Sequence, residues 1–265
     1  MEYFEKLDKH PYEDLKWNVP ERKQGIVNVI GGNGQSFRSE VKVAEFLAGA
    51  YPLQEVRVVM PDKLKSKLPP LPNFVFVPST DSGSFAESQE LLDVFGASDY
   101  NLVLGDLSHN TVTGRAVASA CKNAENMTLV TRDAVDLVAE NMPERVLMNE
   151  NIVFMASVAQ LQKLLRAVYY PKMLLMSSSL VQVAEVLHKF TLSYPVSVVT
   201  LHNEQVLVAH NGVVKAVALS ATGYSPMMFW SGEAAARIVG MNLYNPNQFI
   251  EATICGMIKV DKSSE

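Results

Sequence analysis

The sequence predicts a three-layer α/β/α domain, in which helices cover both faces of a mostly parallel sheet and late strands add an antiparallel edge. Three observations lead to this prediction. Short apolar runs alternate with stretches of helical spacing up to residue 194, and three further β runs follow Pro195 in quick succession. The 265 residues are 48% hydrophobic, which is ample for one large core.

The alternating part of the chain assigns strands and helices in turn. The predicted parallel strands are 25–30, 56–60, 74–77, 100–104, 127–130 and 152–155. The predicted helices are 36–50, 62–68, 86–95, 111–123, 134–141, 157–168 and 178–194. The helix at 157–168 is the clearest, because Val158, Leu161 and Leu164 fall on one face. Pro143 is expected to stop the helix that precedes it.

The last part of the chain is predicted to add antiparallel strands. β runs at 196–201, 205–209 and 213–217 are separated by short polar turns, and Asn211-Gly212 is a strong hairpin signal. Helices are expected at 232–240 and 246–257. We expect residues 25–265 to form a single domain. Residues 1–24 are polar with scattered aromatic side chains, and we expect them to form an arm that packs on this domain.

Composition and charge exclude several classes of function. A net charge of −5 with only 23 Lys and Arg residues provides no basic surface for nucleic acid. No apolar run approaches the roughly 18–20 residues that span a bilayer, and the N-terminus has no signal-peptide core. Neither Cys121 nor Cys255 sits in a metal or disulfide pattern, and no His/Asp/Glu spacing resembles a metal site. We therefore expect a cytoplasmic protein that binds a small molecule and no membrane.

Parallel sheets bind ligands beyond the carboxyl ends of their strands, and the first of these loops is rich in glycine. Gly31, Gly32, Asn33 and Gly34 lie between a predicted strand and a predicted helix. Their backbone N–H groups can approach an anion at the helix N-terminus. The loop has neither the Gly-x-Gly-x-x-Gly spacing nor the Gly-Lys-Ser/Thr ending of common nucleotide loops. A sterically demanding turn is the alternative interpretation.

Two further strand-end loops carry polar side chains. Asp106, His109 and Asn110 place a carboxylate, an imidazole and an amide in one strand-to-helix loop, which favours a ligand site. Asn110 is alternatively a helix cap, and Asp106 alternatively binds loop amides. Asp133 follows the next predicted strand, where a helix N-cap is the simpler role.

A late loop places a possible anion site beside a possible base. Ser231 and Gly232 open a predicted helix, where free N–H groups can hold a phosphate or oxyanion. Glu233 directly follows and could act as a general base. Alternatively, Ser231 caps the helix and Glu233 only complements the helix dipole.

Taken in order, these features resemble the ribokinase-like superfamily, and most closely its ADP/ATP-dependent NAD(P)H-hydrate dehydratases. The resemblance runs roughly from Gly25 to Met257. Its supporting segments are Val29-Ile30-Gly31-Gly32 as opening strand and turn, Leu104-Gly105-Asp106-Leu107 where that family has Gly-Pro-Gly-Leu-Gly, residues 129–137 (LVTRDAVDL) beside its VLDADALNL, and Ser231-Gly232-Glu233 where it has a Gly-x-Gly-Asp anion hole.

The resemblance implies a nucleotide-dependent enzyme, either a dehydratase that repairs hydrated nicotinamide nucleotides or a small-molecule kinase. It also implies ADP or ATP as cofactor, Mg²⁺ as a candidate companion ion, and a homo-oligomer. The implied phosphate and nucleotide side comprises Asn203, Gly223, Ser231 and Gly232, with Glu233 as catalytic base. The implied substrate side comprises Gly31, Gly32, Asn33, Gly34, Asp106, His109, Asn110 and Asp133.

Several residues depart from that family's pattern. Glu233 stands where the family has its catalytic Asp, and Trp230 stands at the first glycine of the anion hole. The family's Thr-Pro-His-Pro-Gly-Glu loop is replaced by Met155-Ala156-Ser157-Val158, a late Lys-Gly is missing from Thr200-Leu201-His202-Asn203, and Thr131 replaces one carboxylate of its Asp-Ala-Asp. Displacing a catalytic base by about 1 Å costs on the order of a hundredfold in rate.

These departures keep two other functions open. The first is a catalytically inactive relative that binds a nucleotide or dinucleotide. The second is an ordinary Rossmann-type oxidoreductase, which ranks last because its glycine fingerprint has no clean match in the sequence.

Overall fold

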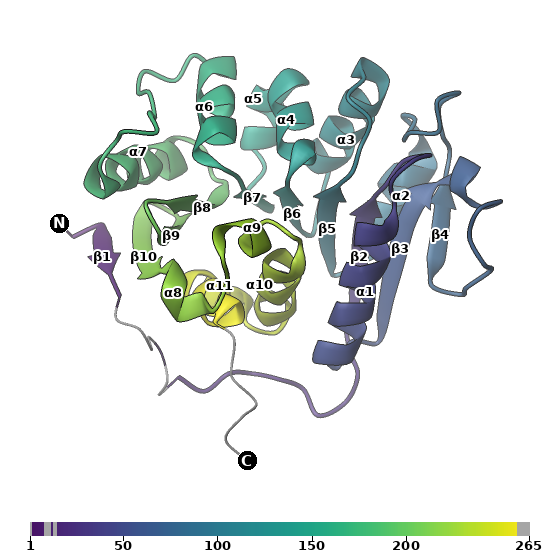
Figure 1. Cartoon of the computed structure of the whole chain (residues 1–265), viewed down its shortest axis with the longest axis horizontal. Helices are drawn as coiled ribbons and strands as arrows, with labels where there is room; N and C mark the ends of the chain where they lie inside the picture. The colour runs from purple at the N-terminus through teal and green to yellow at the C-terminus, as the bar shows by residue number, and fades with distance from the viewer. Residues whose placement is uncertain (1, 8–11, 13–14, 259–265) are drawn as a thin grey trace.

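The structure, a computed structural model that describes residues 2–7, 12 and 15–258, has helices on both faces of a central sheet (Figure 1). In the described part of the chain this sheet has ten strands, in the order β1-β10-β9-β8-β7-β6-β5-β2-β3-β4. Neighbouring strands from β8 to β4 pair in parallel, β9 is antiparallel to both of its neighbours, and β1 is parallel to β10. The predicted three-layer fold with late antiparallel strands is confirmed.

The strands are β1 (Phe4–Lys6), β2 (Ile26–Gly31), β3 (Glu55–Pro61), β4 (Phe74–Val77), β5 (Tyr100–Gly105), β6 (Met127–Thr131), β7 (Ile152–Met155), β8 (Ser197–His202), β9 (Gln205–His210) and β10 (Val213–Ala218). Every residue of β5 is buried, as expected for a parallel strand that helices cover on both faces.

The longer helices are α1 (Arg38–Ala50), α2 (Gln89–Gly96), α3 (Thr111–Lys122), α4 (Asp133–Glu140), α6 (Val158–Ala167), α7 (Leu180–Ser193), α10 (Glu233–Tyr244) and α11 (Phe249–Met257). The shorter ones are α5 (Pro143–Leu147), α8 (Leu219–Thr222), α9 (Pro226–Phe229) and the 3₁₀ turns η1 (Asp62–Leu64) and η2 (Pro246–Gln248). Among the described residues no helix combines the length and apolar character of a bilayer span.

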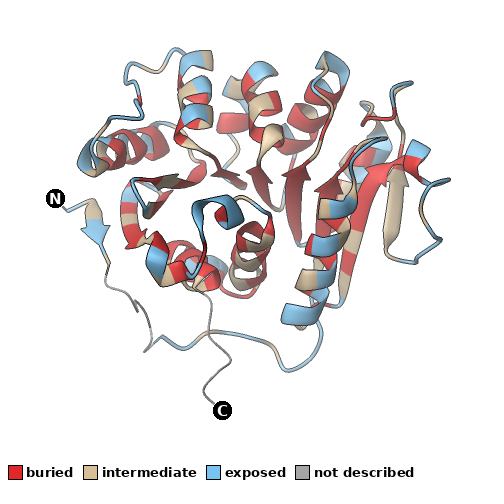
Figure 2. Cartoon of the chain, viewed as in Figure 1, coloured by how far each residue is buried: buried red, intermediate tan, exposed pale blue. Residues whose placement is uncertain are grey.

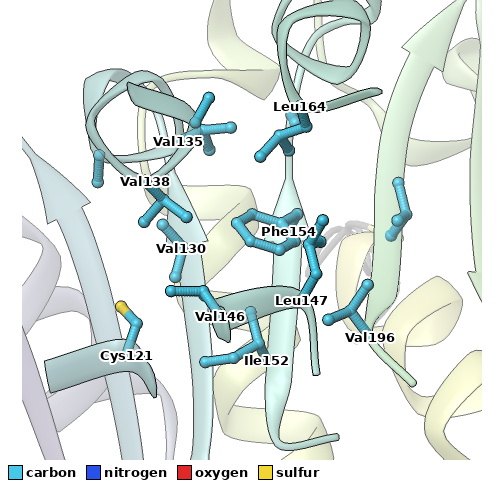
Figure 3. Packing of buried hydrophobic residues seen from close by; sticks show 14 of the residues in the cluster. Cys121, Val130, Val135, Val138, Val146, Leu147, Ile152, Phe154, Leu164 and Val196 are labelled. Carbon is cyan, nitrogen blue, oxygen red and sulfur yellow. The ribbon is translucent and has the colours of Figure 1, made fainter. Parts of the chain in front are cut away.

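The core has two layers, one on each face of the sheet. One cluster packs α3, α4, α6 and α7 against the strands, and the other packs α1, α10 and α11 against the opposite face. The buried strands run through the middle of the molecule in Figure 2. Figure 3 shows Phe154 of β7, which is fully buried, among Val130, Ile152 and Leu164. Burying one such side chain stabilises the fold by about 2 kcal/mol.

Several elements differ from the sequence prediction, including the short helices α8 and α9, which were not predicted. β1 was not predicted, because its three residues are polar or partly exposed and carry no apolar pattern. Pro143 begins α5 as well as following α4, and proline suits this first position because its missing N–H would have no helical partner there. The predicted helix at 62–68 is only the single turn η1, and Pro69 and Pro70 follow closely.

The described part of the N-terminal arm is joined to the sheet and to the end of α10. β1 pairs with β10, and the Asn18 backbone N–H donates to Asn245 Oδ1 at 2.9 Å. Residues 1, 8–11 and 13–14 of this predicted arm lie outside the described residues, as do residues 259–265 of the predicted domain.

Two tight turns shape the antiparallel edge. Asn211 and Gly212 have φ of 48° and 78°, as a two-residue type I′ turn requires, so the predicted hairpin is confirmed. Asn203 and Glu204 have φ of 47° and 58° and connect β8 to β9 in the same way. The backbone therefore places Asn203 at the carboxyl end of β8.

Candidate active site

The carboxyl ends of β2 and β5 meet at two glycines. A register shift after Ile30 places Gly31 opposite Gly105. A Cβ on Gly31 would lie 2.4 Å from the Gly105 carbonyl oxygen, so the two strand ends can approach this closely only without a side chain. Gly105 has φ of 117°, and a Cβ there would lie 2.2 Å from Asp133 Oδ1. Glycine is therefore required at both positions for the ends of β2 and β5 to pack together.

Hydrogen bonds join the glycine loop to the Asp106 loop. The Gly32 N–H donates to the Gly105 carbonyl at 3.0 Å, and Asn33 Nδ2 donates to the Asp106 carbonyl at 2.7 Å. On its other side the Gly34 N–H donates to the Gly83 carbonyl at 3.1 Å. Two loops that lie about 70 residues apart in sequence thus form one surface at the end of the sheet.

Asp133 organises the loop that follows β5. Its two carboxylate oxygens accept the backbone N–H groups of Asp106 at 2.9 Å and Leu107 at 2.8 Å. Desolvation by burial raises the pKa of Asp133, although these two N–H donors act in the opposite direction. Asp133 is the first residue of α4 and Arg132 is its N-cap, so the simple capping role considered from the sequence does not apply.

Arg132 is a member of this cluster that the sequence interpretation missed. Its guanidinium forms an ion pair with Asp106 at 2.6 Å, and both residues have positive φ, 55° and 54°. Non-glycine residues held in the left-handed region cost of order 1–3 kcal/mol each and concentrate at functional sites. The signal available in the sequence was an arginine directly after a buried strand, between Thr131 and Asp133.

Glu40 is a second missed residue. It is fully buried in the first turn of α1, and neither carboxyl oxygen has a hydrogen-bond partner on another residue. A Cβ on Gly31 would lie 2.7 Å from Glu40 Oε1, which places this carboxyl against the β2–β5 junction. Desolvation by burial raises the pKa of Glu40 to about 8.

His109 and Asn110 have different surroundings. Asn110 is the N-cap of α3, and its Oδ1 accepts the Thr113 N–H at 2.9 Å. This is the helix-cap role that the sequence offered as the alternative to ligand binding. His109 is exposed on the same loop. Of the polar residues predicted in this loop, Asp106 is the one that the structure ties to the glycine loop.

The N-terminus of α10 lies close to the β2–β5 junction. Gly232 is its N-cap with φ of 102°, and a Cβ there would lie 2.9 Å from side-chain carbons of Leu104 and Val43. No side chain caps this helix. Ser231 does not take that role, because its hydroxyl donates to the Met228 carbonyl at 2.7 Å.

Glu233 is held by two neighbours. Arg237 Nε and the Tyr224 hydroxyl both donate to Glu233 Oε1 at 3.2 Å. Desolvation by burial, followed by the charge of Glu233, raises the pKa of Tyr224. Trp230, in the place of a family glycine, is partly buried against the core and meets the Phe229 ring edge-on at 4.9 Å.

Asn203 lies on the other side of the sheet's midline from Asp106, whereas Gly223 is next to Tyr224, which donates to Glu233 at the start of α10. The Leu219 N–H donates to the Glu204 carbonyl at 2.8 Å, which joins the β8–β9 turn to α8. Gly223 ends α8 with φ of 69°, one residue before Tyr224. β8 is three strand spacings from β5, about 14 Å, so Asn203 belongs to a different part of the edge from Asp106.

The loops at this edge are closed by their own hydrogen bonds. Two surface hollows lie instead at the amino ends of the strands. One, of about 900 Å³, is around Asn149 and Asn151, and the other, of about 390 Å³, is around Gly25 and Asp99. Among the described residues, no group of three or more His, Cys, Asp or Glu side chains is arranged to hold a metal ion. The groups left at the carboxyl ends of the strands are the start of α10, which no side chain caps, the Asp106–Arg132 pair and the partly buried carboxylate of Glu233. The N–H groups of Gly32, Asn33 and Gly34 are used within the loops, and the Glu40 carboxyl is fully buried.

Comparison with known proteins identifies the fold. No protein-family model matches the sequence, and no curated protein matches it. Among solved structures, a ribokinase-like superfamily protein from Enterococcus faecalis V583 matches with a TM-score of 0.68 and 16% identity, over 97% of this chain and 86% of that one.

Two proteins of named activity are also similar. An ADP/ATP-dependent NAD(P)H-hydrate dehydratase from Bacillus subtilis, co-crystallized with ATP/Mg²⁺ and soaked with CoA, matches with a TM-score of 0.57 and 11% identity, over 91% of this chain and 82% of that one. An Anopheles gambiae adenosine kinase matches with a TM-score of 0.53 and 10% identity, over 96% and 92%. The fold resemblance inferred from the sequence is confirmed.

Proposed function

We propose that this chain, which has the ribokinase-like fold, is a nucleotide-dependent enzyme that acts on a small molecule. The phosphates of ADP or ATP would bind at the N-terminus of α10, beside Gly223. The substrate would lie against the glycine loop and Asp106. NAD(P)H-hydrate dehydration, which repairs a damaged nicotinamide nucleotide, is the first candidate reaction, and phosphorylation of a small molecule is the second.

The observation that carries this proposal is the position of Gly232. A Cβ on Gly232 would lie 2.9 Å from the Leu104 side chain, so the uncapped start of α10 is next to the residue before Gly105, where the glycine loop and the Asp106 loop meet. Unblocked N–H groups at a helix start favour a phosphate by direct hydrogen bonding and by the helix dipole. A phosphate held there would lie next to the surface proposed for the substrate.

The remaining residues suit this chemistry in part. A bound nucleotide would supply the phosphoryl group, and Mg²⁺ usually takes only one or two carboxylates together with phosphates and water. Mg²⁺ therefore fits as an ion carried by the nucleotide. Glu233, at the first position of α10, would accept the proton of the reacting hydroxyl, and Arg237 would hold its carboxylate in place.

Replacing Glu233 tests this proposal. Glu233→Gln keeps the shape but removes the base, so turnover should fall by about a hundredfold. The measurement is a coupled assay of NADHX repair with ADP or ATP, together with phosphoryl transfer to candidate alcohols. Glu45→Gln, an exposed change on α1, is the matched control. Equal turnover by wild type and Glu233→Gln would remove Glu233 from the mechanism.

The contacts of Glu233 favour a second candidate, a catalytically inactive nucleotide-binding relative. One carboxylate oxygen of Glu233 is already occupied by hydrogen bonds from Arg237 and Tyr224, as in a structural contact. In this case ADP, ATP or a dinucleotide would raise the melting temperature, because binding to the native state stabilises it. Binding without turnover of any substrate supports this candidate, whereas the absence of any thermal shift counts against both.

A further inference from the structure

Glu40 occupies a position where the helix pattern requires an apolar residue. The buried stripe of α1 consists of Glu40, Val43, Ala44 and Leu47, with the spacing of a helix that packs on a sheet. Buried carboxyl groups are normally paired, yet the oxygens of Glu40 find no partner on another residue, and only its own backbone N–H favours the ionised form by hydrogen bonding. Packing alone does not explain an acid at this position.

The carboxyl of Glu40 lies at the point from which both proposed substrate loops extend. It packs against Gly31, whose backbone is opposite Gly105 across the register shift. Gly32–Gly34 continues from one strand end and the Asp106 loop from the other, and the two are joined by Asn33. A change in the charge of Glu40 therefore acts on both loops together.

The charged groups that act on Glu40 come from the ends of β5 and β6. Asp106 and Asp133 disfavour its ionised form, and Arg132 favours it. Arg132 is already paired with Asp106. Helix α10 packs on α1 where Gly232 faces Val43. The charged residues that follow Gly232 in α10 are Glu233 and Arg237, which form an ion pair with each other.

We propose that Glu40 is a positioning residue whose uncharged carboxyl allows the ends of β2 and β5 to close, and whose ionisation separates the two loops and weakens nucleotide binding. The binding part rests on the proposed function. Loss of the proton would place a third negative charge beside Asp106 and Asp133 with only one arginine to balance them. Moving the loops apart, toward water, relieves that repulsion.

The direction of the pH dependence follows from the contacts. The pKa of Glu40 is raised from 4.5 to about 8 in the folded protein. The folded state therefore holds this proton between those values while the unfolded chain loses it. Stability is full below the lower value and falls as the pH rises toward the higher one. Glu40→Gln, which stays uncharged, removes this loss.

The first experiment uses the protein alone, so it does not depend on the proposed function. Urea unfolding midpoints of wild type, Glu40→Gln, Glu40→Leu and the Glu45→Gln control are compared at about pH 5 and about pH 8.5. The expected result is that both Glu40 variants exceed wild type at the higher pH by clearly more than at the lower pH. An equal difference at both pH values would contradict the claim that Glu40 is buried in its uncharged form.

The second experiment measures the affinity for ADP by calorimetry at about pH 6.5 and about pH 9. Wild type and the Glu45→Gln control should bind about tenfold more weakly at the higher pH, and Glu40→Gln should show no such loss. An affinity of wild type that is independent of pH overturns the coupling alone. No ADP binding at either pH overturns the coupling and the nucleotide proposal together, while the urea result still decides the state of Glu40.

Discussion

The two halves of the carboxyl edge are built in different ways. On the β2–β5–β6 side, side chains satisfy the loop backbone: Asp133 accepts two N–H groups, and Asn33 joins the neighbouring loop. On the late side, Gly232 leaves the first turn of α10 uncapped, and Ser231 turns to Met228. One half is closed by its own hydrogen bonds, while the helix start in the other half has no side-chain cap.

This difference suggests a division of work. Loops that are already satisfied are rigid and suit shape recognition of a substrate, because little ordering is lost on binding. A helix start with unblocked N–H groups suits an anion that arrives and leaves. Mutations should therefore affect stability on the first side and ligand binding on the second.

The largest difference in the loss of unfolding free energy is expected between alanine substitutions at two glycines, one on each side. In Gly105→Ala the new Cβ meets a carboxylate at 2.2 Å in a backbone with φ of 117°, so unfolding free energy should fall by about 4 kcal/mol. Gly232→Ala has φ of 102° but meets only side-chain carbons of Leu104 and Val43, so the loss should be about 2 kcal/mol. Urea denaturation measures both, and similar losses would break the comparison.

A smaller difference is expected between the two carboxylates. Asp133→Ala leaves the N–H groups of Asp106 and Leu107 without partners and should cost about 3 kcal/mol. Glu233→Ala removes a partly exposed ion pair and should cost about 0.5 kcal/mol. Urea denaturation and ADP affinity, measured on both variants, check whether Asp133 serves stability and Glu233 serves ligand binding. A larger stability loss for Glu233→Ala would reverse the roles of the two sides.

The smallest effects are expected in the loop before α3. Asn110→Ala removes a helix cap and should cost about 1 kcal/mol, and Asn110→Asp should restore most of it because the carboxylate also accepts the Thr113 N–H. His109→Ala should leave stability unchanged, because His109 is exposed. If His109→Ala lowers substrate turnover while stability is unchanged, the substrate role predicted for His109 is supported.

Much of this edge could be predicted from local sequence. Apolar runs followed by Gly31, Gly105 and Thr131 placed three strand ends correctly, and the positions of the glycine loop and Asp106 followed from them. The ligand roles of these residues stay predictions. Glu40 and Arg132 were missed, because an acid inside a helix and an arginine in a loop look like ordinary surface residues until the fold buries or pairs them.

Periodicity and turn chemistry by themselves determined the layers, the direction of the sheet and the hairpin at Asn211-Gly212, because these features depend on neighbours within a few residues. Only the tertiary structure decided that Asp133 serves the backbone of Asp106 and that the carboxyl of Glu40 lies under Gly31. The first contact joins segments 27 residues apart, and the second depends on how α1 packs on the end of β2. Desolvation, which sets their energy, exists only after the chain has packed.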